Sequence, residues 1–244
     1  MHRSRFTVAP GIVLDARRAV WLEHEKTLAV ADLHLGYAWA HRAAGQMMPL
    51  SIKEDTIERL ELLVRDYCPR ELVILGDVVH RAIRIPALVR TLQDFYEALA
   101  PLTTLRLVAG NHDKHLGELL KRAALELPLH AEWSAGRVRC VHGDGGLPAA
   151  EAMLQGAQKS GECILIGHEH PALSLPDGPT RIKVPVFLWS SGLLVLPAYS
   201  PWAAGSDIQR GQYLSPFLQS NAPDLAIAIL AGKLLPVPLR NSMR

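Results

Sequence analysis

Five short apolar runs, each followed at once by aspartate, asparagine or histidine, constrain this chain more than any other feature of its sequence. One of them covers residues 72–75, ends at Gly76, and is followed by Asp77 and His80. A continuous apolar run of this length is typical of a short strand that is buried on both faces of a sheet. In open α/β sheets, ligands bind outside the carboxyl ends of the strands. The run therefore predicts a functional site at its end.

The same arrangement recurs four times along the chain. Two of these strand-like runs lie in the first half of the chain: residues 28–31 lead into Asp32 and His34, and residues 105–109 lead into Asn111, His112 and Asp113. Two lie in the second half: residues 138–141 lead into His142, and residues 163–166 lead into His168 and His170. On an extended chain, residues i and i+2 point the same way, so each Asp-x-His or His-x-His pair can face one point. A single cluster of this kind is most often a turn or an ordinary histidine. Five that all follow apolar runs are not expected by chance.

Together these side chains form a candidate metal centre. Carboxylate, amide and imidazole groups are the ligands that suit manganese, iron and zinc, and no thiolate is needed. Seven candidates are too many for one ordinary site, but they fit two metal ions if one carboxylate bridges them. The carboxylate at the end of the central strand, Asp77, is the expected bridge. The seven candidate ligands are Asp32, His34, Asp77, Asn111, His142, His168 and His170.

The motif series Asp-x-His, Gly-Asp-x-x-His, Gly-Asn-His-Asp, His-Gly and Gly-His-x-His, between residues 32 and 170, resembles the calcineurin-like metallophosphoesterase superfamily. Residues 193–205 are similar to its bacterial branch often found beside DNA ligases and helicases. The resemblance implies an α/β fold with a two-sheet β-sandwich flanked by helices, and the length suits one domain over residues 1–244. It also implies two ligand sets that share Asp77: Asp32, His34, Asp77 and His170 for one metal ion, and Asp77, Asn111, His142 and His168 for the other.

The reaction implied by the resemblance is hydrolysis of a phosphate ester by a metal-bound hydroxide. His112 follows the ligand Asn111, and because imidazoles titrate near neutral pH we expect it to protonate the leaving group. Many phosphomonoesterase and protein-phosphatase relatives carry a second aspartate at the place of His80. A histidine there resembles the branch of double-strand-break repair nucleases, in which it assists catalysis. His80 therefore favours a phosphodiesterase that acts on nucleotides or nucleic-acid ends, with two divalent metal ions, manganese first and iron or zinc as alternatives.

Two other functions stay open on the sequence: a phosphomonoesterase acting on nucleotide or sugar phosphates, and a scaffold that keeps the fold without turnover. A nuclease should have an open basic cleft, whereas a small-nucleotide enzyme should have an enclosed pocket with aromatic side chains. The candidates for stacking on a base are Trp39, Tyr199 and Trp202, although packing in the core is the commoner role of such residues. The candidates for contact with a substrate phosphate are Arg81 and Arg84, with a solvated loop as an equal alternative. The bacterial branch implies a functional association with DNA repair enzymes.

Composition and charge place only weak limits on the possible functions. The chain has 26 Lys and Arg against 24 Asp and Glu, a net charge of +2, which does not by itself argue for nucleic acid. No stretch approaches the 18 or so consecutive apolar residues of a transmembrane helix, and the N-terminus lacks the apolar segment of a signal peptide. We therefore predict a cytoplasmic protein that does not contact a membrane.

The remaining pattern predicts the elements around the site. Residues 12–31 are expected to form a three-stranded β-meander, and residues 128–141 a hairpin that turns at 134–136. Helices are expected between 36 and 45, from a capping box at 51–54 to Tyr67, and over 88–99, 116–124 and 148–160. Residues 171–199 are expected to form three strands, 200–215 a loop beside the cleft, and 225–237 a closing hairpin.

Overall fold

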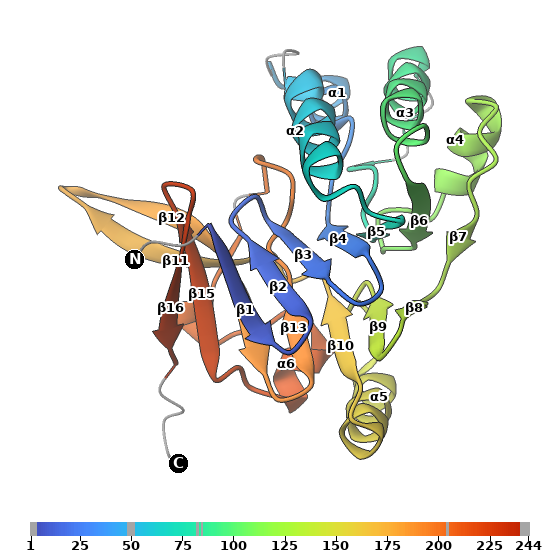
Figure 1. Cartoon of the computed structure of the whole chain (residues 1–244). Coiled ribbons are helices and arrows are strands. Elements are labelled where there is room, and N and C mark those ends of the chain that lie inside the picture. Colours follow the sequence, from blue (N-terminus) through green and yellow to red (C-terminus); the bar gives the residue numbers. More distant parts are fainter. Residues whose placement is uncertain (1–3, 48–51, 82, 84, 204, 240–244) are drawn as a thin grey trace.

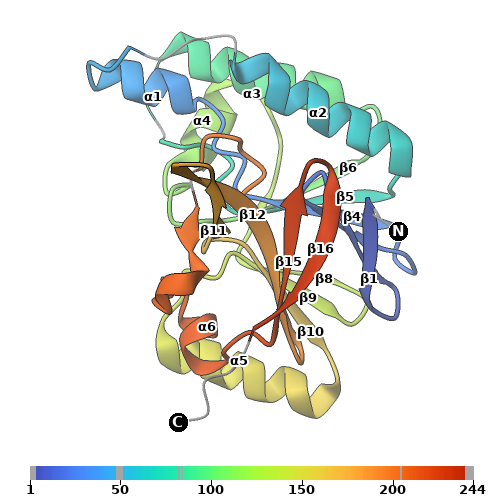
Figure 2. The ribbon, with the colours of Figure 1, turned by 90° about the vertical axis from the view of Figure 1, so that its left-hand side faces the viewer.

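The structure, a computed structural model, describes residues 4–47, 52–81, 83, 85–203 and 205–239. Two β-sheets pack face to face, and helices cover the outer face of each sheet (Figures 1 and 2). The predicted α/β fold, a two-sheet sandwich flanked by helices, is confirmed. No helix in the described residues is long and apolar enough to cross a membrane.

The first sheet has seven strands in the order of the sequence. They are β1 (Arg5–Ala9), β2 (Ile12–Asp15), β3 (Ala19–Leu22), β4 (Thr27–Ala31), β5 (Glu71–Leu75), β6 (Thr104–Val108) and β7 (Leu129–His130). The first four strands pair antiparallel, whereas β4, β5, β6 and β7 pair parallel. Four helices belong to this half of the chain: α1 (Tyr37–Ala43), α2 (Ile52–Tyr67), α3 (Pro86–Leu99) and α4 (Leu116–Arg122).

The second sheet has a more complex order. Along one path lie β14 (Ser206–Asp207), β11 (Pro171–Asp177), β12 (Thr180–Ser190), β13 (Leu193–Val195), β10 (Cys163–Ile166), β9 (Val138–Val141) and β8 (Trp133–Ala135). The long strand β12 also pairs with β15 (Leu225–Leu230), which is followed by β16 (Lys233–Pro238). Two helices, α5 (Leu147–Ser160) and α6 (Pro216–Ser220), and the 3₁₀-helix η1 (Ile208–Arg210) complete this half.

Alternation along β5 shows how the layers are held together. Val73 and Leu75 face the apolar core between the two sheets, whereas Leu72 and Ile74 face the core under the helices. All four are fully buried, as expected for a parallel strand covered on both faces. A third core lies between the second sheet and α5 and α6, and it includes Leu154, Ile164 and Phe217.

Most of the predicted elements are present, and the differences lie where strand pairing decides the outcome. The meander over residues 12–31 is β2, β3 and β4, but β1 precedes it and was not expected. Of the hairpin predicted over residues 128–141, β8 and β9 form the part that turns after Ala135, whereas Leu129 and His130 form β7, which joins β6 in the first sheet. The loop over 200–215 contains β14 and η1, and α6 follows it unpredicted. The capping box at 51–54 lies outside the residues whose side chains are described.

Candidate metal centre

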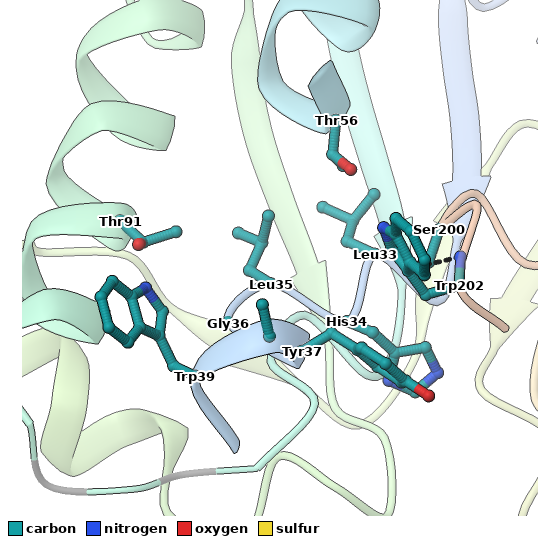
Figure 3. A pocket seen from close by; sticks show the side chains of 11 residues that line it. Leu33, His34, Leu35, Gly36, Tyr37, Trp39, Thr56, Thr91, Ser200 and Trp202 are labelled. Atoms are coloured by element: carbon teal, nitrogen blue, oxygen red, sulfur yellow. Dashed lines mark hydrogen bonds between the residues drawn. The ribbon is translucent and has the colours of Figure 1, made fainter. Parts of the chain in front are cut away.

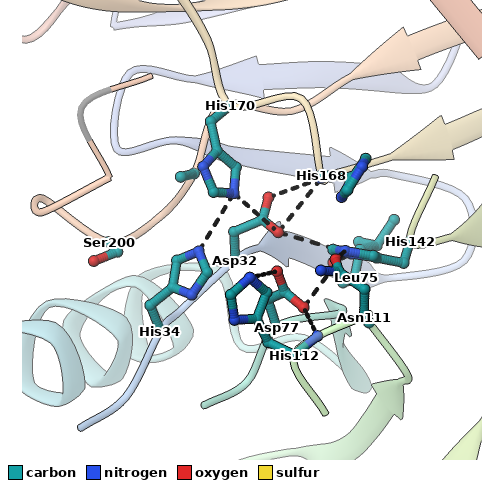
Figure 4. A network of polar contacts seen from close by, with 12 residues as sticks. Asp32, His34, Leu75, Asp77, Asn111, His112, His142, His168, His170 and Ser200 are labelled. Carbon is teal, nitrogen blue, oxygen red and sulfur yellow. Dashed lines mark hydrogen bonds and ion pairs between the residues drawn. The ribbon is translucent and has the colours of Figure 1, made fainter. Parts of the chain in front are cut away.

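The candidate ligands meet at one end of the sandwich. Strands β4, β5 and β6 run parallel in the first sheet, and β9 and β10 run parallel in the second. Their carboxyl ends carry, in turn, Asp32 and His34, Asp77, Asn111, His142, and His168 and His170. Figure 4 shows all seven side chains around one small region, so the structure brings together every ligand candidate from the sequence.

The backbone at five of these residues is left-handed. Asp32, His34, Asp77, His168 and His170 have φ angles of 56°, 47°, 47°, 63° and 48°. The side chains therefore reach the site through tight left-handed turns and not through the strand alternation that the sequence predicted. Such conformations cost a non-glycine residue roughly 1 kcal/mol or more each, and they persist where the surrounding structure enforces them, often at functional sites.

Glycines before the ligands make room for ligand side chains that follow other strands. A Cβ on Gly76 would lie 2.0 Å from Nδ1 of His142, and one on Gly110 would lie 2.3 Å from Oδ1 of Asp77. Both contacts are far shorter than van der Waals distance, so any larger residue at either place would displace a candidate ligand. This explains the Gly-Asp and Gly-Asn pairs of the motif in physical terms.

One group of ligands surrounds Asp32. The ligand atoms of Asp32, His34, Asp77 and His170 lie within 4.8 Å of one another. Nε2 of His170 is 3.4 Å from Nε2 of His34 and 3.3 Å from Oδ1 of Asp32. The Asp32 carboxylate is itself held in place because it accepts a hydrogen bond from the His168 backbone N–H at 3.1 Å.

The second group surrounds His142. Its Nδ1 lies 3.1 Å from the carbonyl oxygen of Leu75, and donation to that carbonyl leaves the lone pair of Nε2 directed at the site. Nε2 is 3.1 Å from Oδ1 of Asn111 and 3.5 Å from Oδ1 of Asp77. The His168 ring packs edge-on against it, with ring centroids 5.0 Å apart. Asp77 thus contacts both groups, which is the position that a bridging ligand requires.

His112 and His80 lie beside the first group. Nδ1 of His112 is 2.6 Å from the backbone carbonyl of His80, and Nε2 is 3.9 Å from Oδ2 of Asp77. The His112 backbone N–H also donates to Oδ1 of Asp77 at 2.9 Å. Asp113 supports this loop from behind, because its buried carboxylate accepts hydrogen bonds from the N–H groups of Val78, Val79 and Gly110.

Burial and mutual charge set the electrostatics of the centre. Burial alone would raise the pKa of Asp32, but the neighbouring histidines, His170 first, keep that pKa below its usual range. Burial, with the charge of Asp32 added, raises the pKa of Asp77. Burial lowers the pKa of His34 to about 3 and, with His112 and His41, that of His80 to about 4. Both imidazoles are therefore neutral at physiological pH, the form in which histidine binds a metal.

These residues fit divalent metal ions. The separation of the His34 and His170 nitrogens, 3.4 Å, matches the roughly 3.4 Å expected for two nitrogens that share one tetrahedral ion at about 2.1 Å. Two buried carboxylates, Asp32 and Asp77, lie among imidazoles without a lysine or arginine partner among the described residues. Such a set of oxygen and nitrogen donors is stabilised by bound cations.

The three stacking candidates lie in different surroundings. Tyr199 is fully buried, and Arg59 lies over its ring, so it cannot contact a substrate base. A cavity of only about 20 Å³, room for about one water, lies beside His34, and Trp39 lines it on the side of Thr91 (Figure 3). Trp202 is 37% exposed and stacks on Tyr37, with ring centroids 6.3 Å apart.

Of the two arginines predicted to contact a substrate phosphate, the structure describes only one. Arg81 is exposed in the loop that follows His80, and Arg84 lies outside the described residues. Sequence reasoning missed Glu169, a fully buried residue between two candidate ligands, and Arg18, which comes from the distant β2–β3 turn. The Glu between the two histidines of Gly-His-x-His was a visible signal for the first, whereas nothing in the local pattern pointed to the second.

The β-sandwich brings Asp, Asn and His side chains together at the ends of parallel strands in both sheets, in positions that could hold metal ions. The family model described as calcineurin-like phosphoesterase matches residues 25–228, and the chain belongs to this family. It is accordingly a hydrolase of phosphoric esters with a site for divalent metal ions.

Comparison with solved structures agrees with this assignment at the level of the fold. The nuclease MPE of Pseudomonas putida is 21% identical, with a TM-score of 0.69, and the match covers 97% of this chain and 100% of that one. Two weaker matches have TM-scores of 0.31. A predicted phosphoesterase of Streptococcus pneumoniae is 13% identical over 70% of each chain, and a Vps29 double mutant of Entamoeba histolytica is 14% identical over 79% and 89%. A comparison with curated proteins gave no match.

Proposed function

We propose that the protein is a phosphodiesterase that cleaves nucleic-acid phosphodiesters with two divalent metal ions, manganese first among them. Asp32, His34, Asp77 and His170 would hold one ion, and Asp77, Asn111, His142 and His168 the other. When bound, two such ions would offset the charge of the phosphate and supply an activated water. The similarity in fold to a nuclease supports this class of substrate.

The openness of the centre is the observation that carries the proposal. Asn111 is exposed, and the His112 side chain is 38% exposed, so one side of the site is open to solvent. The cavity beside His34, about 20 Å³, has room for about one water and does not enclose a base or a sugar. A diester has an arm on each side of its phosphorus atom, and an open centre can accommodate both arms of a continuing strand.

The chain's own residues supply the proton for the leaving group in this mechanism. The Nδ1–H of His112 donates to the carbonyl of His80, and this fixes the ring so that Nε2 faces Asp77 and the centre. A proton on Nε2 can then pass to the leaving oxygen as the phosphorus–oxygen bond breaks. A backbone carbonyl, and not the carboxylate of an aspartate, orients the acid here. His80 itself adds no negative charge beside an anionic substrate.

The test is hydrolysis of bis-p-nitrophenyl phosphate against p-nitrophenyl phosphate, with manganese and with a chelated control. The proposal predicts a strong preference for the diester that is lost on chelation. Preference for the monoester would instead support a phosphatase of nucleotide or sugar phosphates. An absence of turnover on both substrates, with metals bound, would support the scaffold function.

A further inference from the structure

A pocket of about 200 Å³ lies next to the metal centre, with His170 as part of its wall. Much of the remaining wall is rigid and apolar, since four prolines line it: Pro171, Pro185, Pro197 and Pro201. Two cationic side chains, Arg18 and Lys183, line the same pocket. It therefore combines a fixed shape with positive charge, directly beside the site where phosphoester chemistry is proposed.

Arg18 enters the pocket from the turn between β2 and β3, at a left-handed φ of 67°. Its NH1 group donates hydrogen bonds to the carbonyls of Ala198 at 3.0 Å and Ser200 at 2.9 Å. Burial, with the nearby charge of Arg59, lowers the pKa of Arg18 to about 10. Among the described residues no carboxylate forms an ion pair with it. A partly buried guanidinium held only by carbonyls keeps donors for an anion.

Lys183 approaches the pocket from β12. Its Nζ donates to the carbonyl of Gly205 at 2.8 Å, and the part of the chain that the structure describes offers it no carboxylate. The side chain is exposed, so it can turn toward a ligand at little cost. Arg181, two residues earlier on the same strand, is differently engaged, because it donates to the Ser174 carbonyl and to Gln209.

We propose that this pocket binds the phosphate adjacent to the scissile one, through Arg18 and Lys183. The substrate would then be an oligonucleotide or polynucleotide strand, and not a small diester with a single phosphorus atom. Arginine and lysine are the side chains that most often position a nucleic-acid backbone, and contacts to phosphates fix its register without reading its sequence. The inference rests on the proposed function, because the neighbouring phosphate is defined relative to the one that is cleaved.

Trinucleotides with two linkages provide the test. One version carries two phosphodiesters, and two others carry one phosphodiester with an uncharged methylphosphonate on its 5′ or its 3′ side. The variants are Lys183→Gln and, for the guanidinium, the conservative Arg18→Lys. The control is Lys159→Gln, which removes the same charge from the end of α5, at the opposite end of β10 from His170.

In the wild type, a methylphosphonate on one of the two sides should raise KM about tenfold, the loss expected for one charge-assisted contact. Lys183→Gln should raise KM for the all-phosphodiester trinucleotide by a similar factor, with little further rise when the methylphosphonate is present. Its effect on KM for bis-p-nitrophenyl phosphate should be much smaller. Lys159→Gln should behave as the wild type, and thermal unfolding should show that each variant is folded.

Two results would overturn the pocket while leaving the phosphodiesterase intact. One is a KM that is insensitive to the methylphosphonate on either side. The other is a rise in KM for Lys183→Gln on the methylphosphonate substrate that equals the product of the two separate rises. Independent effects of this kind would mean that Lys183 does not contact the neutralised linkage. Failure of the proposed function is distinguishable from both, because the wild type would then leave bis-p-nitrophenyl phosphate and every trinucleotide uncleaved with metals present.

Discussion

Replacing His112 with alanine should remove the general acid and leave the metal ligands in place. General acid catalysis is worth about 100- to 10,000-fold in rate. The ring of His112 is fixed by the carbonyl of His80 at 2.6 Å, but 38% of the side chain is exposed, so water can partly replace it as a proton donor. We therefore expect a loss near the lower end, about 100-fold in kcat, or about 3 kcal/mol in activation free energy.

The leaving group distinguishes this role from a structural one. A nucleoside alkoxide is a strong base and needs a proton as it departs, whereas p-nitrophenolate is a weak base and leaves without one. His112→Ala should therefore lose about 100-fold on a dinucleotide and only a few-fold on bis-p-nitrophenyl phosphate. His115→Ala is the matched control, because that ring lies three residues further along and is exposed beside Glu118. Equal losses on the two substrates, or a loss of bound metal, would refute the acid role.

Three further perturbations concern His80 and Glu169 at the centre and Asp15 at the end of β2. His80→Asp should shift the ratio of diester to monoester turnover toward the monoester, measured on the two nitrophenyl substrates; an unchanged ratio would remove His80 from the specificity argument. Glu169→Ala should lower the free energy of unfolding by about 3 kcal/mol in chemical denaturation, because the buried carboxylate accepts from Leu214 and Ser215 backbone N–H groups at 2.8 and 2.9 Å; a loss below about 1 kcal/mol would contradict this. Burial alone would raise the pKa of Asp15, but hydrogen bonds from Arg17 and Tyr67 hold it below 3.8. The stabilisation of the fold by the Asp15 carboxylate should therefore be complete above about pH 4 and be lost as pH falls through the lower folded pKa. Asp15→Asn should flatten that part of the pH profile of Tm.

The sequence predicted much of the site because its signals are local. A buried strand leaves a continuous apolar run, and a ligand at its end follows within one or two residues, as at Gly76 and Asp77. The helices were predictable for the same reason, since α2 repeats its apolar residues at helical spacing and α3 begins at Pro86.

The remainder depends on contacts between distant parts of the chain. Whether β7 pairs with β6 or with β8 is decided by which sheet edge is free, and the run of side chains is the same in either case. Tyr199 is a core residue, the commoner of the two roles that the sequence left open for it, and the sequence could not decide because an aromatic residue after a strand can face either a cleft or the core. The pocket beside His170 joins a β2–β3 turn residue to β12, residues separated by more than half of the chain.

The central claim is that two metal ions share Asp77, and a metal titration of the apoprotein tests it most directly. The wild type should bind two equivalents of manganese per chain, with phosphodiesterase activity that depends on both. Asp77→Asn should weaken both equivalents together, because that carboxylate contacts both ligand groups. A single equivalent in the wild type, or a variant that loses one equivalent and keeps the other at full affinity, would contradict the account.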